Sequence, residues 1–166
     1  MYIKEVKRIE NAYLCGVICG GRCCKSVPCS YFPEDFGDPP TMETLLKKIN
    51  SGRATLLRVE GYERRMMISR TRDRGVVDII SREEWILNGG KMAWLRECAF
   101  LTPQGCGMSL EDRPSAGAVF VPKFIEGTKH CYMPISVQSL WDPYQPLLAE
   151  LEEYLLAEQQ KSPGRF

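Results

Sequence analysis

TMETLLKKINSGRATLLRVEGYERRMMISR, residues 41–70, contains the signals of a helix and of two strands in direct succession. The helix is predicted because four apolar residues recur with the spacing of one helix face: Met42, Leu45, Leu46 and Ile49. Thr41 can cap the first turn, and Ser51-Gly52 is a typical stop. The first part of this stretch therefore predicts a short amphipathic helix over residues 42–50.

The second part of the same stretch predicts an antiparallel hairpin. Residues 53–60 and 64–70 are rich in Leu, Val, Met and Ile, and Gly61-Tyr62 lies between them. Residues 76–80 are a candidate third strand. Ser81 and Glu84 form a possible capping box, which predicts a short helix that Gly89-Gly90 ends.

Residues 144–160 carry the clearest helical pattern of the chain. Its apolar stripe is predicted to comprise Leu147, Leu148, Leu151, Tyr154 and Leu155, and its exposed face Glu150, Glu152, Glu153 and Glu158. There is no internal repeat and no shift in composition. We therefore expect one α+β domain over residues 1–160, with an irregular Cys-rich, metal-stapled loop, an antiparallel hairpin and this C-terminal amphipathic helix, followed by a flexible tail over residues 161–166.

Charge and hydropathy exclude several classes of partner. Lys and Arg number 22 against 21 Asp and Glu, so a net charge of +1 gives no general attraction to nucleic acid. The first residues alternate charged and apolar side chains, which does not match a signal peptide, and no apolar stretch approaches the length of a membrane span. We expect a cytoplasmic protein with no membrane partner, and its cysteines to be thiolates rather than disulfides.

Five of the eight cysteines lie within residues 15–29, in a segment that is also rich in Gly and Pro. Such a segment is expected to be a loop over residues 15–40 that depends on cross-links rather than on repeating backbone hydrogen bonds. A reducing compartment and dense thiols favour a metal centre. Zinc is preferred, and iron or an iron–sulfur cluster is the alternative.

Two further cysteines, Cys98 and Cys106, flank the turn Thr102-Pro103-Gln104. A hairpin there would hold two thiols close together, as a ligand pair requires. The candidate metal ligands are Cys19, Cys23, Cys24, Cys98 and Cys106, with Cys15, Cys29 and Cys131 as further members.

Two motifs of the chain resemble the YkgJ-like cysteine-cluster family, described as putative zinc- or iron-chelating domains. They are residues 19–24, CGGRCC, and residues 98–106, CAFLTPQGC, which continue to SLEDRP at residues 109–114. The resemblance implies metal chelation through these cysteines. Family members typically place another cysteine shortly after that Arg-Pro, whereas residues 115–122 of this chain contain none.

Other roles stay open at the level of the sequence. His130, the sole histidine, is a candidate nitrogen ligand or the base of a Cys–His enzyme, and Glu34-Asp35 with Asp38 are candidate hard ligands. Arginines of residues 64–74 are candidate phosphate contacts. The spacing of Cys15, Cys19 and Cys23 does not match a radical S-adenosylmethionine enzyme. An iron–sulfur or open-site metalloenzyme of unknown substrate is the alternative function, so enzymatic activity is undecided.

Overall fold

The computed structural model describes residues 29–62, 66–72, 75–90, 97–109, 112–116, 121–125, 128–132 and 137–163. For Cys29 and for the strands within residues 121–132 the description is confined to the backbone. The expected element over residues 1–14 and the candidate ligands Cys15, Cys19, Cys23 and Cys24 lie outside the described residues.

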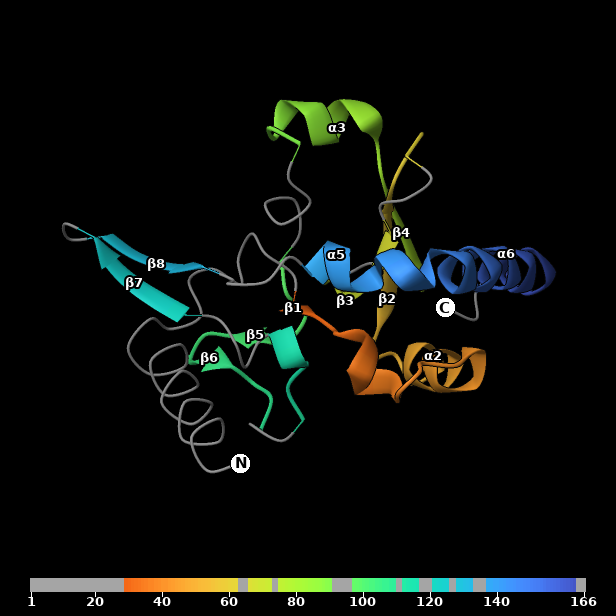
Figure 1. Cartoon of the computed structure of the whole chain (residues 1–166), viewed down its shortest axis with the longest axis horizontal. Helices are drawn as coiled ribbons and strands as arrows, with labels where there is room; N and C mark the ends of the chain where they lie inside the picture. Colours follow the sequence, from red (N-terminus) through yellow and green to blue (C-terminus); the bar gives the residue numbers. More distant parts are fainter. Residues whose placement is uncertain are drawn as a thin grey trace.

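The described elements combine helices and strands throughout the chain, which confirms the α+β class (Figure 1). In chain order they are β1 (Cys29–Ser30), the 3₁₀ helix η3 (Pro33–Phe36), α2 (Met42–Asn50), β2 (Thr55–Val59), β3 (Met66–Arg70), β4 (Val77–Ile80), α3 (Arg82–Leu87), β5 (Leu101–Thr102), β6 (Gly105–Cys106), β7 (Val121–Ile125), β8 (Thr128–Tyr132), α5 (Val137–Trp141), the 3₁₀ helix η5 (Asp142–Tyr144) and α6 (Gln145–Lys161).

The central sheet has the strand order β1-β3-β2-β4. The predicted hairpin is confirmed, because β2 and β3 pair antiparallel with Leu56 opposite Ile68. The predicted third strand is also confirmed, and it pairs parallel to β2 with Leu57 opposite Asp78. The chain therefore has to cross over between β3 and β4, which places β4 at the edge of the sheet far from β1.

Helices α2 and α3 begin as their sequences predict. The Thr41 hydroxyl accepts a hydrogen bond of 3.3 Å from the Thr44 nitrogen, and α2 buries Leu45 and Ile49. The Ser81 hydroxyl accepts one of 3.1 Å from the Glu84 nitrogen at the start of α3. The capping signals therefore placed both helix starts correctly.

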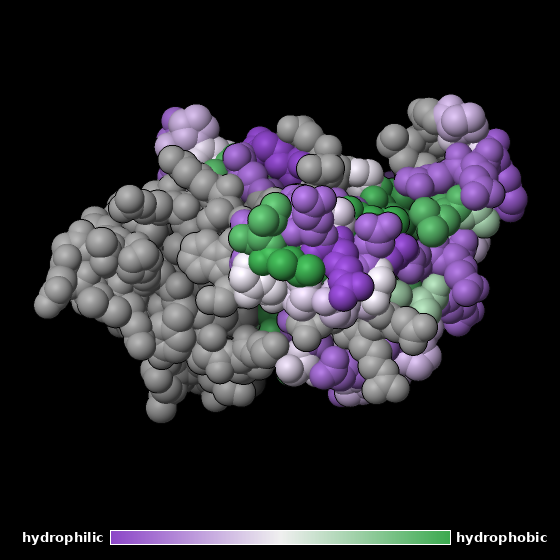
Figure 2. All heavy atoms as spheres, turned by 90° about the horizontal axis from the view of Figure 1, so that it is seen from above, coloured by the Kyte–Doolittle hydropathy of each residue, from purple (hydrophilic) through white to green (hydrophobic). Residues whose placement is uncertain are grey.

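Helix α3 lies at the surface, away from the sheet in Figure 1. It has no buried residue, and Ile86 and Leu87 are 57% and 77% exposed. Its connection to the rest of the fold includes Trp85, whose ring centre lies 4.5 Å from that of Tyr62. Figure 2 shows patches of exposed hydrophobic residues among the hydrophilic residues of one face.

The predicted C-terminal helix is confirmed as α6, and its buried stripe contains Leu148, Leu151 and Leu155. Two details of the predicted pattern are wrong. Glu152 is buried rather than exposed, because its carboxylate forms an ion pair with Arg58 of β2. Tyr154 is 47% exposed rather than part of the stripe. The helix also continues through Lys161, one residue beyond its expected end.

An aromatic cluster joins the segment after β1 to the end of α5. Trp141 is fully buried, and its indole nitrogen donates a hydrogen bond of 2.9 Å to the Tyr31 carbonyl oxygen. The Phe36 ring lies between them, with centres 5.3 Å from Tyr31 and 5.8 Å from Trp141. The expectation of a loop without repeating backbone structure is therefore wrong for residues 29–36, which form β1, η3 and part of the core.

Candidate metal centre

Two candidate ligands lie beside the end of β3. Cys29 of β1 pairs with Arg70, and the Tyr31 nitrogen donates to the Ile68 carbonyl at 2.9 Å. Cys98 forms an isolated antiparallel bridge with Thr71, which is the next residue after β3. The segment at the end of the N-terminal cysteine cluster and the distant Cys98 segment therefore both pair with the end of β3.

Both cysteines lie along the same edge of β3. Carbonyl groups two residues apart in a strand point to the same side, and the Ile68 carbonyl points to β1. The Arg70 carbonyl therefore points the same way, and it accepts a hydrogen bond of 3.2 Å from the Ala99 nitrogen. The Cys98 segment therefore pairs with β3 on the same edge as β1, next to the residue at which β1 begins.

The predicted hairpin between Cys98 and Cys106 is confirmed as β5 and β6. Leu101 pairs with Cys106, and the Leu101 nitrogen donates to the Cys98 carbonyl at 3.2 Å. Thr102 shapes the turn, since its hydroxyl accepts from the Gln104 nitrogen at 3.2 Å and donates to the Gly105 carbonyl at 2.9 Å. No disulfide joins Cys98 to Cys106, so both sulfurs keep the chemistry of thiols.

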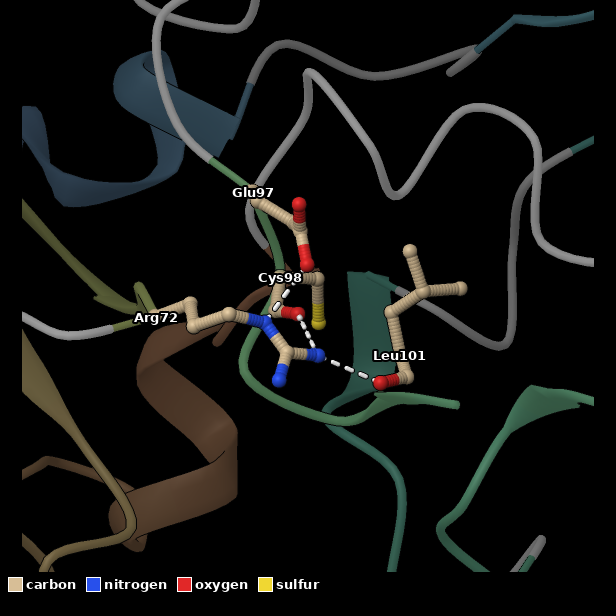
Figure 3. A network of polar contacts seen from close by, with 4 residues as sticks. All are labelled: Arg72, Glu97, Cys98 and Leu101. Atoms are coloured by element: carbon tan, nitrogen blue, oxygen red, sulfur yellow. Dashed lines mark hydrogen bonds and ion pairs between the residues drawn. The ribbon is translucent and has the colours of Figure 1, made fainter. Parts of the chain in front are cut away.

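Arg72 holds the turn that follows Cys98 (Figure 3). One terminal guanidinium nitrogen donates to the Leu101 carbonyl and, at 3.4 Å, to the Cys98 carbonyl. The Arg72 Nε lies 2.5 Å from a carboxylate oxygen of Glu97. The Arg72 side chain therefore holds the backbone at Cys98 and in the turn after it, while its charge is paired with the Glu97 carboxylate.

Asp35 connects the segment after Cys29 to the segment after Arg113-Pro114. Its carboxylate accepts hydrogen bonds from the Phe32 nitrogen at 2.8 Å, from the Ser115 nitrogen at 3.0 Å and from the Ser115 hydroxyl at 2.5 Å. These contacts engage both carboxylate oxygens. Asp35 therefore acts as a structural link, while Glu34 and Asp38 are exposed.

Cys131 and His130 lie in a different hairpin. On β8, Cys131 pairs with Pro122 and His130 with Lys123 of β7, and Figure 1 shows β7 and β8 extending away from the central sheet. In the described part of the chain, no three His, Cys, Asp or Glu residues gather as a group that could hold a metal ion. None of the described helices has the length and apolar character that crossing a bilayer requires.

Sequence reasoning missed a row of buried hydroxyl groups beside Cys98. Thr55, Ser69 and Thr71 are fully buried, and within the described part of the structure their hydroxyl oxygens have no hydrogen-bond partner. Thr55 pairs with Ser69, and Ser69 and Thr71 are two residues apart, so all three share one face of the sheet. Small polar residues at alternate positions of a buried strand are the sequence signal that marks this row.

Comparison of the chain with protein-family models, curated proteins and solved structures finds no match. The resemblance to the YkgJ-like cysteine-cluster family, carried by residues 19–24 and 98–114, stays a prediction. The cysteine pattern and the contacts around Cys98 are therefore the features that bear on function.

Proposed function

We propose that the chain is a cytoplasmic metal-binding protein whose centre is formed by thiolates of the N-terminal cluster together with Cys98 and Cys106. One observation supports this most directly: β3 brings the backbones of Cys29 and Cys98 to the same edge, opposite Arg70 and Thr71. These two cysteines are 69 positions apart in the sequence, and their backbone positions bring the segment that follows the N-terminal cluster next to the Cys98 segment. Because Arg70 and Thr71 face opposite sides of the sheet, the thiolates that join Cys98 are expected from the cluster before Cys29.

Chain length supports a contribution from the rest of the cluster. Cys29 lies five positions after Cys24, and an extended chain advances about 3.4 Å per residue, so their Cα atoms can be at most about 17 Å apart. Cys23 is only one residue further away. The length of the connection therefore allows both cysteines to contribute to a centre beside the end of β3.

The donor set suits a soft or borderline metal ion. Four thiolates make the usual structural zinc site, and the same ligands hold iron–sulfur clusters. Zinc is preferred because closed thiolate sites are its commonest structural use. Asp35 and Arg72 would keep the two ligand-bearing segments in place, since each joins residues that are distant in the sequence.

The test is elemental analysis of protein purified without oxygen. We expect a transition metal at about one equivalent or more per chain. A colourless zinc protein supports a structural centre, whereas a brown protein with visible charge-transfer absorption supports iron–sulfur chemistry and the redox alternative. Protein that carries far less than one equivalent of any transition metal, and that takes up none when metal is supplied, contradicts the proposal.

A pair of variants identifies the ligands. Replacing Cys98 and Cys106 by Ser is expected to abolish stoichiometric metal binding, because Ser does not supply a thiolate. The matched control is Cys131→Ser, whose backbone lies in the β7–β8 hairpin. Retention of the metal by the double variant would show that the centre is not built on the Cys98 segment, and equal loss in the control would add Cys131 to the ligands.

A further inference from the structure

We propose that Thr71 is a positioning residue for the metal centre, and that its hydroxyl donates a hydrogen bond to the Cys98 sulfur when this sulfur is a metal-bound thiolate. The inference rests on the proposed function. It starts from a fully buried side chain whose hydroxyl has no partner in the described part of the chain.

The backbone places Thr71 and Cys98 directly opposite each other. The bridge between them is flanked by two hydrogen bonds, Ala99 nitrogen to Arg70 oxygen and Arg72 nitrogen to Glu97 oxygen. This is the non-hydrogen-bonded type of antiparallel pair, in which the Cα atoms approach to about 4.5 Å and the two side chains lie on the same face. Cys98 is 1% exposed, so both side chains are inside the protein.

Metal binding changes what the sulfur can accept. A thiol is a weak acceptor, whereas a thiolate bound to a metal carries charge and accepts hydrogen bonds readily. A buried hydroxyl without a partner is unfavourable, and Thr populates more than one side-chain rotamer. Rotation of the Thr71 side chain can therefore satisfy its hydroxyl and stabilise the thiolate in the same step.

The same row of hydroxyls supplies a matched control. Thr55 is also fully buried and its hydroxyl also has no partner in the described residues. It lies on β2, on the far side of β3 from the Cys98 segment, because β1 and β2 flank β3 on opposite edges. Replacing Thr55 removes a hydroxyl of the same kind without touching Cys98.

The test compares the variants Thr71→Val, Thr71→Ser and Thr55→Val in metal-binding titrations. Thr71→Val is expected to weaken metal binding about 10- to 100-fold, which is the usual effect of removing a group that orients a metal ligand. Thr71→Ser and Thr55→Val are expected to bind like the wild type. The sulfur-to-metal charge-transfer band of the cobalt-substituted protein is expected to shift in Thr71→Val alone.

The outcomes separate this inference from the proposed function. Wild-type protein that binds no metal overturns both. Wild-type protein that binds metal while Thr71→Val matches its affinity and its cobalt spectrum overturns the inference alone, as does an equal loss of affinity in Thr55→Val. Should Thr71→Val fail to fold, the smaller Thr71→Ala carries the same expectation.

Discussion

Asp35 and Ser115 are joined by two hydrogen bonds, although they are 80 positions apart in the sequence. The same carboxylate accepts from the Phe32 nitrogen, so η3 is tied to the segment that follows Arg113-Pro114. A carboxylate therefore provides this contact between the two segments.

The first prediction concerns this link. Replacing Asp35 by Ala removes three hydrogen bonds to a charged acceptor and leaves the Ser115 hydroxyl without its partner. We expect a loss of about 3 kcal/mol in the free energy of unfolding, measured by urea denaturation. The exposed Asp38→Ala is the control and is expected to stay within about 0.5 kcal/mol of the wild type. Equal stability of the two variants would contradict the assignment of Asp35 as a link.

The second prediction concerns Arg72. Its guanidinium holds the carbonyls of Cys98 and Leu101 and the carboxylate of Glu97. Arg72→Ala is expected to reduce the free energy of unfolding by about 1–3 kcal/mol, because two carbonyls lose a charged donor. It should also weaken metal binding, since the turn after Cys98 is no longer held. The exposed Arg53→Ala should change neither quantity, and metal affinity that is identical in both variants would count against this role.

The third prediction concerns the ion pair between Arg58 and Glu152. The Arg58 side chain is 23% exposed and the Glu152 side chain 11%, so solvent screens the pair only in part. Glu152→Gln is expected to lower the free energy of unfolding by about 1–2 kcal/mol, since Arg58 would remain half-buried beside a neutral partner. The adjacent, exposed Glu153→Gln is the control. Thermal unfolding that does not distinguish the two would show that the pair contributes little.

The fourth prediction concerns Trp141. Substitution by Phe removes the donor to the Tyr31 carbonyl and leaves part of the buried indole volume empty. The expected loss is about 2 kcal/mol, with a weaker near-ultraviolet circular dichroism signal from the aromatic cluster. Trp85→Phe, in the surface helix α3, should cost less. A larger effect of Trp85→Phe would mean that the cluster around Phe36 is not the tightest part of the core.

The fifth prediction concerns removal of the metal. Because a metal centre supplies folding energy to the segments that it joins, a chelator is expected to lower amide protection in residues 97–106 first. Helices α2 and α6 should keep theirs, since Leu45, Ile49 and Leu148 are held by the apolar core. Hydrogen exchange followed by mass spectrometry measures this, and uniform loss of protection across the chain would contradict a local role.

Local pattern was enough to predict the elements around the central hairpin. The spacing of Leu45 and Ile49 specifies a helix face, and the caps at Thr41 and Ser81 mark helix starts, because these signals act over a few residues. The parallel pairing of β4 with β2 could not be predicted in this way. It depends on which strand edges are available after folding, and no short stretch of sequence carries that information.

The errors and omissions have the same physical origin. Glu152 has the pattern of an exposed residue, and only a partner 94 positions away makes its burial favourable. The neighbouring backbone positions of Cys29 and Cys98 likewise depend on both segments pairing with one edge of β3. For the candidate site, the cysteine pattern predicted the β5–β6 hairpin, while the positions of Thr71, Arg72 and Asp35 required the three-dimensional arrangement.

The hydrogen bond from Trp141 to Tyr31 spans 110 positions of the chain. During synthesis on a ribosome, the ring cluster around Phe36 cannot close until Trp141 has left the exit tunnel. Contacts of such long sequence separation form slowly, and until they form, the apolar residues near β1 stay exposed to other proteins. Cys29, which begins β1, would spend that interval accessible to oxidants and to competing metal ions, so early loading of the proposed centre would protect the growing chain.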